Sequence, residues 1–358
     1  FTIQRGFGTN HGAGVYLYAN GVLRNCHVTN NHITTASRYG AGVYNDGGTV
    51  DNCKVYGNSI ITTSGQVKGG GIYMTDGLIT NCEVYDNEVK SGTSTSNPQG
   101  AGICIVAPYS GSSSKLENTY IHDNYSYGYG GGLYLSGYST NRRIDVVNCN
   151  IENNKADGNG GGVYLSRYAN LINCNVNNNT SKQYGAGGYI GGYNEIYNCN
   201  FLNNLINNES TSYNGAGIYT ISSDNFYNCI IWGNKKNGVS NQVALGSGVA
   251  NIKHSAIEGG YTGAANLTLS SDNTGSDSNL FYPKFTNPSA GAGAEYRGGN
   301  WTLQEGSDCI DKGTTEGLAV ALPETDIDGN DRIFNNKIDL GPYESPYQGS
   351  SITPGTNN

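Results

Sequence analysis

The chain is short of several kinds of residue, and each shortage excludes a class of protein. Only 13% of residues are charged and the net charge is −8, so the basic surface of a nucleic-acid-binding protein is missing. Pro occurs 8 times in 358 residues, too rarely for a collagen-like or low-complexity chain. No run approaches the roughly 20 apolar residues of a membrane-spanning helix. The first residues already follow a strand-like pattern, so any export signal is expected to have been removed or to lie outside this sequence.

Gly and Tyr, with 54 and 28 residues, are abundant, and both belong to an internal repeat. The pentad Gly-(Ala/Gly)-Gly-x-Tyr occurs eight times at intervals of 25 to 31 residues, and only Cys104 replaces its Tyr. The pentads begin at Gly12, Gly40, Gly69, Gly100, Gly130, Gly160, Gly185 and Gly215. A repeat of this length without helical spacing is typical of stacked structural units.

A second motif follows each pentad and contains a Cys preceded by Asn. The Cys position holds Cys26, Cys53, Cys82, Thr119, Cys149, Cys174, Cys199 and Cys229. Another Asn follows five residues later, at Asn31, Asn58, Asn87, Asn124, Asn154, Asn179, Asn204 and Asn234. Apolar residues flank the Cys position, three residues before it and two after it, in every copy.

The spacing of the apolar residues predicts strands joined by sharp corners. Period-two alternation in the first pentad points Val15 inward and Tyr16 outward. Leu23 and Cys26 are both apolar, but their odd spacing of three residues would place them on opposite faces of one straight strand. The chain must therefore turn a corner between them. Asn25 lies at this corner, and Asn tolerates the left-handed conformation that such a bend needs. The sequence therefore predicts an all-β, single-stranded parallel β-helix of about eight regular coils, in which equivalent residues stack into columns.

Two of these columns are predicted to be structural. Stacked inward cysteines do not have the Cβ separation and torsion of a disulfide, so we expect free, buried thiols that pack as small hydrophobic side chains. The column from Asn31 to Asn234 is expected to stack its amides and bond them to the backbone or to one another.

The outward Tyr column is the first candidate binding site. Tyr rings along one face could contact sugar rings and bond through their hydroxyls, or they could stack on one another and shield the sheet. The column consists of Tyr16, Tyr44, Tyr73, Tyr134, Tyr164, Tyr189 and Tyr219.

Outward polar residues on the third to fifth coils form the second candidate, a small cluster of acid–base groups. Its members are Glu83, His122, Asp123 and Glu152, with Lys54 and Asn175 at equivalent positions on nearby coils. Hydrolysis of a glycosidic bond needs two suitably placed carboxylates. Because the spacing matches no catalytic motif, a non-catalytic binding module and a polysaccharide-cleaving enzyme both remain open. The longest insertions, between Asn87 and Gly100, between Cys104 and Leu116, and between Asn204 and Gly215, favour a groove near the third to fifth coils.

The repeat fades after Asn234, and three segments are predicted: coils over residues 1–258, an irregular section and cap over 259–345, and a tail over 346–358. The cap would cover the open end of the solenoid. Asp326 and Asp328 could hold calcium, but the spacing is not that of an EF-hand, and Asp side chains that fix a turn and pair with Arg332 explain the pattern equally well. No metal or other cofactor is otherwise expected.

These motifs resemble known bacterial proteins. The pentads and the Val28-x-x-Asn31 pattern are similar to the repeats of polymorphic outer-membrane proteins and of pectate-lyase-like β-helices. The segments 307–313, 326–332 and 339–344 resemble the choice-of-anchor-Q type of right-handed β-helix protein, with Leu340 and Pro342 departing from its pattern. The resemblance covers nearly the whole chain. It implies a right-handed helix secreted by, or displayed on the outer membrane of, a Bacteroides-like bacterium, without a defined activity.

The function expected from these observations is that of an adhesin-like surface protein that binds carbohydrate or a host surface molecule. The alternative is a polysaccharide lyase or glycoside hydrolase acting on an extracellular polysaccharide. We expect a monomer without a nucleic-acid partner, attached to the membrane rather than spanning it.

Overall fold

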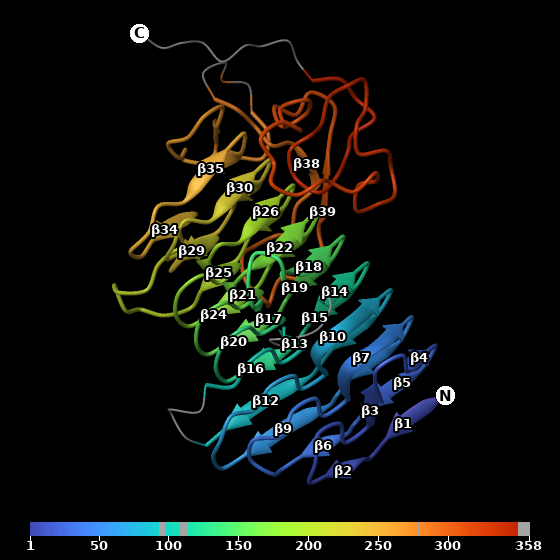
Figure 1. Cartoon of the computed structure of the whole chain (residues 1–358). Helices are drawn as coiled ribbons and strands as arrows, with labels where there is room; N and C mark the ends of the chain where they lie inside the picture. Colours follow the sequence, from blue (N-terminus) through green and yellow to red (C-terminus); the bar gives the residue numbers. More distant parts are fainter. Residues whose placement is uncertain (93–96, 108–113, 276, 278–279, 350–358) are drawn as a thin grey trace.

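The chain folds into an elongated parallel β-solenoid with an irregular C-terminal cap (Figure 1). The computed structural model describes residues 1–92, 97–107, 114–275, 277 and 280–349. Parts of two predicted insertions and of the predicted tail (93–96, 108–113 and 350–358) lie outside the described residues. Within the described chain there is no α-helix, and so none long and apolar enough to cross a membrane. The all-β prediction is confirmed.

Three long sheets run along the axis. Sheet A consists of β1 (Thr2–Gln4), β5 (His27–Thr29), β8 (Lys54–Tyr56), β11 (Glu83–Tyr85), β15 (Tyr120–His122), β19 (Asn150–Glu152), β23 (Asn175–Asn177), β27 (Asn200–Leu202), β31 (Ile230–Trp232), β36 (Ala256–Glu258) and β37 (Leu267–Leu269). Sheet B consists of β2 (Phe7–Gly8), β6 (His32–Ile33), β9 (Ser59–Thr62), β12 (Glu88–Ser91), β16 (Tyr125–Ser126), β20 (Lys155–Ala156), β24 (Thr180–Ser181), β28 (Leu205–Ile206), β32 (Lys235–Lys236) and β33 (Val239–Ser240).

Sheet C has two rows, which the long strands β7 (Val43–Asp51) and β10 (Ile72–Thr80) join. The row that contains the pentads has β3 (Val15–Tyr18), β13 (Ile103–Val106), β17 (Leu133–Ser136), β21 (Val163–Arg167), β25 (Gly188–Gly192), β29 (Ile218–Thr220) and β34 (Val243–Leu245). The other row has β4 (Val22–Arg24), β14 (Ser114–Glu117), β18 (Ile144–Val147), β22 (Ala169–Ile172), β26 (Glu195–Tyr197), β30 (Asn225–Tyr227) and β35 (Asn251–Lys253). A separate antiparallel pair, β38 (Phe285–Asn287) and β39 (Asn300–Leu303), lies in the cap.

The corners have the conformations that the sequence predicts. The Asn before each Cys position, from Asn25 to Asn228, has a φ between 48° and 58°. The first Gly of every pentad has a φ between 60° and 72°. A Cβ on Gly130 would lie 2.3 Å from the carbonyl oxygen of Leu133, so this corner requires glycine.

Neighbouring coils lie in register, so like residues form columns. Val28 pairs with Val55, and Val84 with Ile121, in the interior of the solenoid. In the Asn column, each Nδ2 donates to the Oδ1 of the Asn on the next coil at 2.9–3.1 Å, from Asn31 to Asn234. Gln242 ends the column by accepting a 2.6 Å bond from Asn234. The predicted Asn ladder is confirmed.

The nine cysteines are buried and free, as predicted. Their neighbours explain why the column tolerates a change at one coil. The backbone N–H of Cys26 donates to the Sγ of Cys53, and that of Cys82 donates to the hydroxyl of Thr119 in the same way. Burial raises the pKa of Cys229 to about 12, which keeps this thiol neutral.

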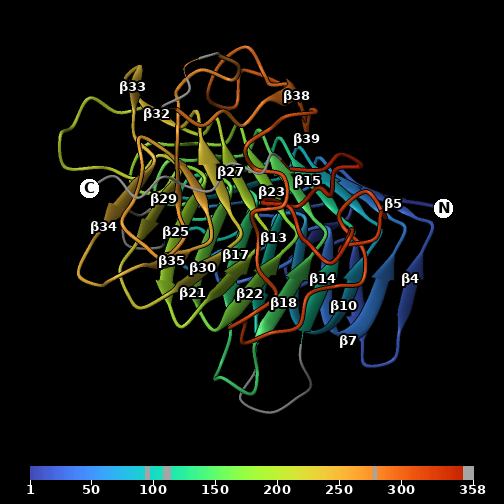
Figure 2. The same cartoon turned by 90° about the horizontal axis from the view of Figure 1, so that it is seen from above.

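The cap packs on the outer face of sheet A over the last coils (Figure 2). Leu202, Ile230 and Trp232 of sheet A form one apolar cluster with Phe285 and Trp301 of the cap. Sheet A continues beyond residue 258, because β37 pairs with β36. The cap therefore covers mainly one end of this face, and its loop 289–299 reaches back to the fourth coil at Asp123.

Candidate functional site

A groove follows the solenoid axis along the uncovered part of sheet A. Its volume is about 440 Å³. The corner residues Asn25, Asn52, Asn81 and Asn118 line one side, and His27, Lys54, Glu83 and Tyr120 of sheet A line the other. Numbering each coil by its pentad, the groove crosses coils one to four, so it overlaps the predicted position at coils three to five but starts nearer the N-terminus.

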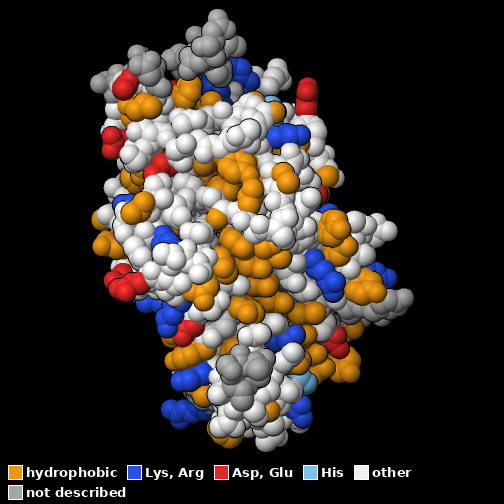
Figure 3. All heavy atoms as spheres, turned by 90° about the vertical axis from the view of Figure 1, so that its left-hand side faces the viewer, with side chains coloured by type: hydrophobic (Ala, Val, Ile, Leu, Met, Phe, Trp, Pro, Cys, Tyr) orange, Lys and Arg blue, Asp and Glu red, His pale blue; other side chains and the backbone are white. Residues whose placement is uncertain are grey.

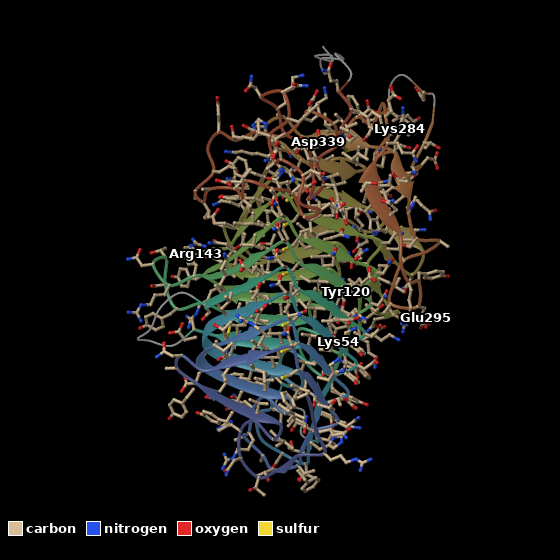
Figure 4. The ribbon with its side chains drawn as sticks, turned by 90° about the vertical axis from the view of Figure 1, so that its right-hand side faces the viewer. Lys54, Tyr120, Arg143, Lys284, Glu295 and Asp339 are labelled. Atoms are coloured by element: carbon tan, nitrogen blue, oxygen red, sulfur yellow. The ribbon has the colours of Figure 1, made fainter. Side chains whose placement is uncertain are left out.

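The four residues of the predicted acid–base cluster meet beside this groove. Equivalent positions on adjacent strands place Glu83, Tyr120 and Asn150 in one column, and His122 beside Glu152 in the next. Figure 4 shows Lys54 and Tyr120 on this face, below the cap, with Arg143 on the far side of the solenoid. Strand register thus brings together groups that are about 30 to 40 residues apart in the sequence.

Charged hydrogen bonds connect the cluster. Lys54 Nζ lies 2.6 Å from Glu83 Oε2, His122 Nε2 lies 3.4 Å from Glu83 Oε1, and His122 Nδ1 lies 2.8 Å from Asp123 Oδ2. Burial alone would lower the pKa of His122, but the hydrogen bonds and negative charges of Asp123 and Glu83 raise it overall. Burial would raise the pKa of Glu83, but Lys54 and His122 lower it overall. The arrangement favours protonated His122 between two carboxylates.

Aromatic rings hold the imidazole in place. His122 stacks on Tyr85 with ring centroids 5.0 Å apart and planes 4° apart, and its other close ring neighbour is Tyr120, at 4.1 Å. The Tyr120 hydroxyl donates to Glu152 Oε1. Burial and the bond to Glu152 raise the pKa of Tyr120, so this hydroxyl remains a proton donor.

A loop of the cap closes one side of the cluster. This loop, residues 289–299, is called the arm below. It follows the corner between sheets A and B, where Asn178 Nδ2 donates to Gly298 O at 3.2 Å and Arg297 pairs with Asp123 Oδ1 at 2.8 Å. Figure 4 shows Glu295 of the arm at the level of Tyr120. Burial and the nearby charge of Asp123 raise the pKa of Asp86 on the same corner.

Some members of the cluster could be found from the sequence and one could not. Lys54 and Tyr120 occupy the repeat position of Glu83, so the alignment of the repeats locates them. Arg297 lies 174 residues beyond Asp123, in a segment without a repeat, and no local pattern predicts its contact. Asn175, which the sequence predicted at an equivalent outward position, does not join the cluster, because it lies buried under the cap.

The predicted Tyr column exists, but most of its rings stack on one another. The centroid separations are 4.7 Å for Tyr16 and Tyr44, 5.0 Å for Tyr134 and Tyr164, and 4.6 Å for Tyr164 and Tyr189. A second column adds Tyr39, Tyr129 and Tyr184 beside them. Figure 3 shows hydrophobic side chains gathered along the axis on this side of the solenoid.

Stacking limits what this column can contact. Tyr16 at the first coil is 45% exposed, whereas Tyr73 is only 7% exposed. Cys104, which replaces the Tyr between Tyr73 and Tyr134, is fully buried. The ring faces point to neighbouring coils, so ring edges and hydroxyls are the groups left for a ligand. This geometry favours the packing role for the inner members.

Of the two candidate calcium ligands, Asp326 has its side chain occupied by hydrogen bonds. Asp326 Oδ1 accepts from the backbone N–H of Asp328 and Asn330, and its Oδ2 accepts from the backbone N–H of Glu344. Arg332 pairs with Glu344 at 3.1 Å rather than with either predicted Asp. In the described chain, no group of three or more His, Cys, Asp or Glu residues is arranged to hold a metal ion. These contacts support the turn-fixing interpretation over a calcium site.

Comparison with known proteins agrees with this architecture. The family model of the right-handed β-helix region matches residues 7–201, which is more than half of the chain. Comparisons with curated proteins and with solved structures find no significant match. Together with the in-register parallel coils, the family match leads to one conclusion: the chain belongs to the right-handed β-helix family.

Proposed function

We propose that this protein binds an extracellular polysaccharide in the axial groove of sheet A. The observation that carries the proposal is the groove itself, because Lys54, Glu83 and Tyr120 place a cation, a carboxylate and a hydroxyl along it. Ligand sites typically combine a concave surface with a few such convergent polar groups.

The shape of the groove suits a linear polymer. It crosses four coils, and three strand separations of about 4.8 Å give roughly 14 Å between the first and fourth. The corner amides of Asn25 and Asn52 bond to each other at 2.7 Å, so this wall is held in place before a ligand binds. Fixed donors and acceptors lower the entropic cost of binding hydroxyl-rich ligands.

The test is a glycan-array screen followed by titration calorimetry with the best oligosaccharide. Glu83→Gln and Tyr120→Phe each remove one charged or hydrogen-bonding group, and each should weaken binding by about tenfold. Glu209→Gln changes an exposed carboxylate away from the groove and should bind like the unaltered protein. Equal affinities in all three variants would show that the groove is not the site.

Cleavage of the bound polysaccharide is a second candidate, favoured by the two acid–base pairs beside the groove. Hydrolysis needs one group that protonates the leaving oxygen and another that removes a proton from water. Protonated His122, held by Asp123 and Glu83, can supply the first role. Glu152, bonded to the Tyr120 hydroxyl, can supply the second. Release of new reducing ends that disappears in His122→Asn would support this hydrolysis, and binding without products would leave the protein as a binding module.

The location proposed for this activity is outside the cell. The motifs of this chain resemble two groups of proteins, the choice-of-anchor-Q type and the polymorphic outer-membrane proteins. Both resemblances suggest display on an outer membrane. A host surface glycan is then a suitable ligand for an adhesin-like role. The Tyr column stays a secondary binding prediction, and unchanged glycan retention by Tyr134→Ala would remove it.

A further inference from the structure

A second hollow lies on the opposite side of the arm, between the arm and sheet B. Its volume is about 520 Å³. The strands β20, β24, β28 and β32 form its floor, and residues 290–296 of the arm form its wall. The arm is fixed there, because Gly293 N donates to Asn203 O at 2.7 Å and Ala294 N donates to Thr180 Oγ1 at 2.8 Å. The hollow, here called the sheet B cleft, is therefore bounded on both sides by hydrogen-bonded backbone.

The sheet B cleft is locally basic in a chain with a net charge of −8. Lys155, Lys182 and Lys235 line it, against Asp157 and Glu295. Asp157 pairs with Lys182 at 2.8 Å and also accepts a 2.9 Å bond from the Tyr125 hydroxyl. Lys155 and Lys235 are exposed and form no ion pair with any described residue. Two ammonium groups are thus left for an anionic ligand.

The spacing of these two lysines indicates an extended ligand. They occupy the same column of sheet B on strands β20 and β32, which are three strand separations apart, or about 14 Å. Leu205 lies between them on β28, next to Gly293 of the arm, and Ala292 and Ala294 of the arm also line the cleft. Asn207 adds an amide at the edge of the cleft. Cationic groups at both ends, an apolar residue between them and an amide beside it match a short chain of sugar rings that carries anionic groups.

We propose that the sheet B cleft is a separate binding site for a saccharide that carries carboxylate or sulfate groups. Lys155 and Lys235 bind the anionic groups, and Leu205 packs against the apolar face of a ring between them. This site does not depend on the groove of sheet A, because the arm separates the two and they share no lining residue.

Titration calorimetry of the full chain tests the proposal with three probes. A tetragalacturonate carries carboxylates, a chondroitin sulfate tetrasaccharide carries both carboxylates and sulfates, and cellotetraose is neutral. At least one acidic probe should bind and the neutral one should bind far more weakly. The affinity should fall as salt is raised, because exposed ion pairs are screened. A preference between the acidic probes identifies which anionic group the cleft takes.

Matched charge removals separate this cleft from the rest of the surface. The double variant Lys155→Gln/Lys235→Gln should bind the acidic probe about tenfold or more weakly. Lys115→Gln/Lys253→Gln removes two positive charges elsewhere and should leave the affinity unchanged. Equal loss in both double variants, or no binding of either acidic probe to the unaltered chain, would overturn the proposal. So would an affinity that falls only in Glu83→Gln, a result that would assign the ligand to the groove of sheet A.

Discussion

Removing one amide from the middle of the Asn ladder should destabilise the solenoid strongly. Asn124 Nδ2 donates to Val84 O, His122 O and Asn154 Oδ1, each at 2.9 Å, and its Oδ1 accepts from the backbone N–H of Asn87 at 3.1 Å. In Asn124→Ala, two buried backbone groups, the Asn87 N–H and the Val84 carbonyl, and the partly buried His122 carbonyl lose these partners. Each unsatisfied buried group costs about 1–3 kcal/mol, so the free energy of unfolding should fall by about 3 kcal/mol or more.

The same substitution at the first coil provides the comparison. Asn31 accepts from Gly6 N and donates to Ile3 O, and both of these partners lie in the partly exposed first turn of the chain. Water can replace the lost bonds there, so Asn31→Ala should cost about 1 kcal/mol. The expected difference therefore comes from burial of the partners rather than from the residue type.

Urea unfolding measures both losses. Far-ultraviolet circular dichroism follows the strands, while fluorescence of Trp232 and Trp301 follows the contact between sheet A and the cap. A smaller shift of the urea midpoint in Asn31→Ala than in Asn124→Ala is expected, with similar slopes. Equal shifts in the two variants would refute the reasoning, because the ladder would then contribute the same at a solvated coil as at a buried one.

Three further outcomes are expected. Gly130 and Gly238 both have a positive φ, 64° and 78°, but only at Gly130 would a Cβ also meet the Leu133 carbonyl; Gly130→Ala should therefore lower the urea midpoint by more than Gly238→Ala, and equal midpoints would contradict this contact. Folding raises the pKa of His122 above 6.5, so the stability that its protonation contributes should be full below pH 6.5 and lost as the pH rises through the folded pKa. Asp123→Asn keeps a residue that tolerates the left-handed corner and should lower the His122 pKa in an NMR titration. An unchanged pKa would argue against the His122–Asp123 pair. A thiol reagent should label few cysteines in the folded protein and nine in urea, whereas full labelling without urea would contradict their burial.

Much of the solenoid could be predicted from the sequence because each coil repeats the same physical constraints. The left-handed corner at Asn25 could be predicted because two apolar residues on either side of it must both face inward, which one straight strand does not allow. The free thiol of Cys53 could be predicted because cysteines stacked in register lack the geometry of a disulfide. Glu83 and His122 could be placed on one face for the same reason, since strand register converts a position in the repeat into a position in space.

The cap and the environment of the site could not be predicted in this way. The contact between Arg297 and Asp123 joins a repeat to an irregular segment, and no periodic pattern links the two. The burial of Tyr73 depends on Tyr39 from the neighbouring column, whose members are Tyr at only some coils. The sheet B cleft exists only because the irregular arm packs beside sheet B. From the sequence alone, its lysines therefore could not be distinguished from ordinary exposed lysines.

The replacement of the ladder Asn by Gln242 has a consequence for assembly. At this coil β33 turns back and pairs antiparallel with β32, and the Gln242 amide also bonds to Ser240 and Glu258. To extend sheet B, a second molecule stacked head to tail would need a parallel edge strand and a free ladder Asn at this end, and the described residues of sheet B offer neither. Open-ended growth into a fibre requires complementary surfaces at both ends of each subunit. Because the edge of sheet B is blocked in this way, its column of stacked strands does not offer a second molecule a matching surface for continued growth.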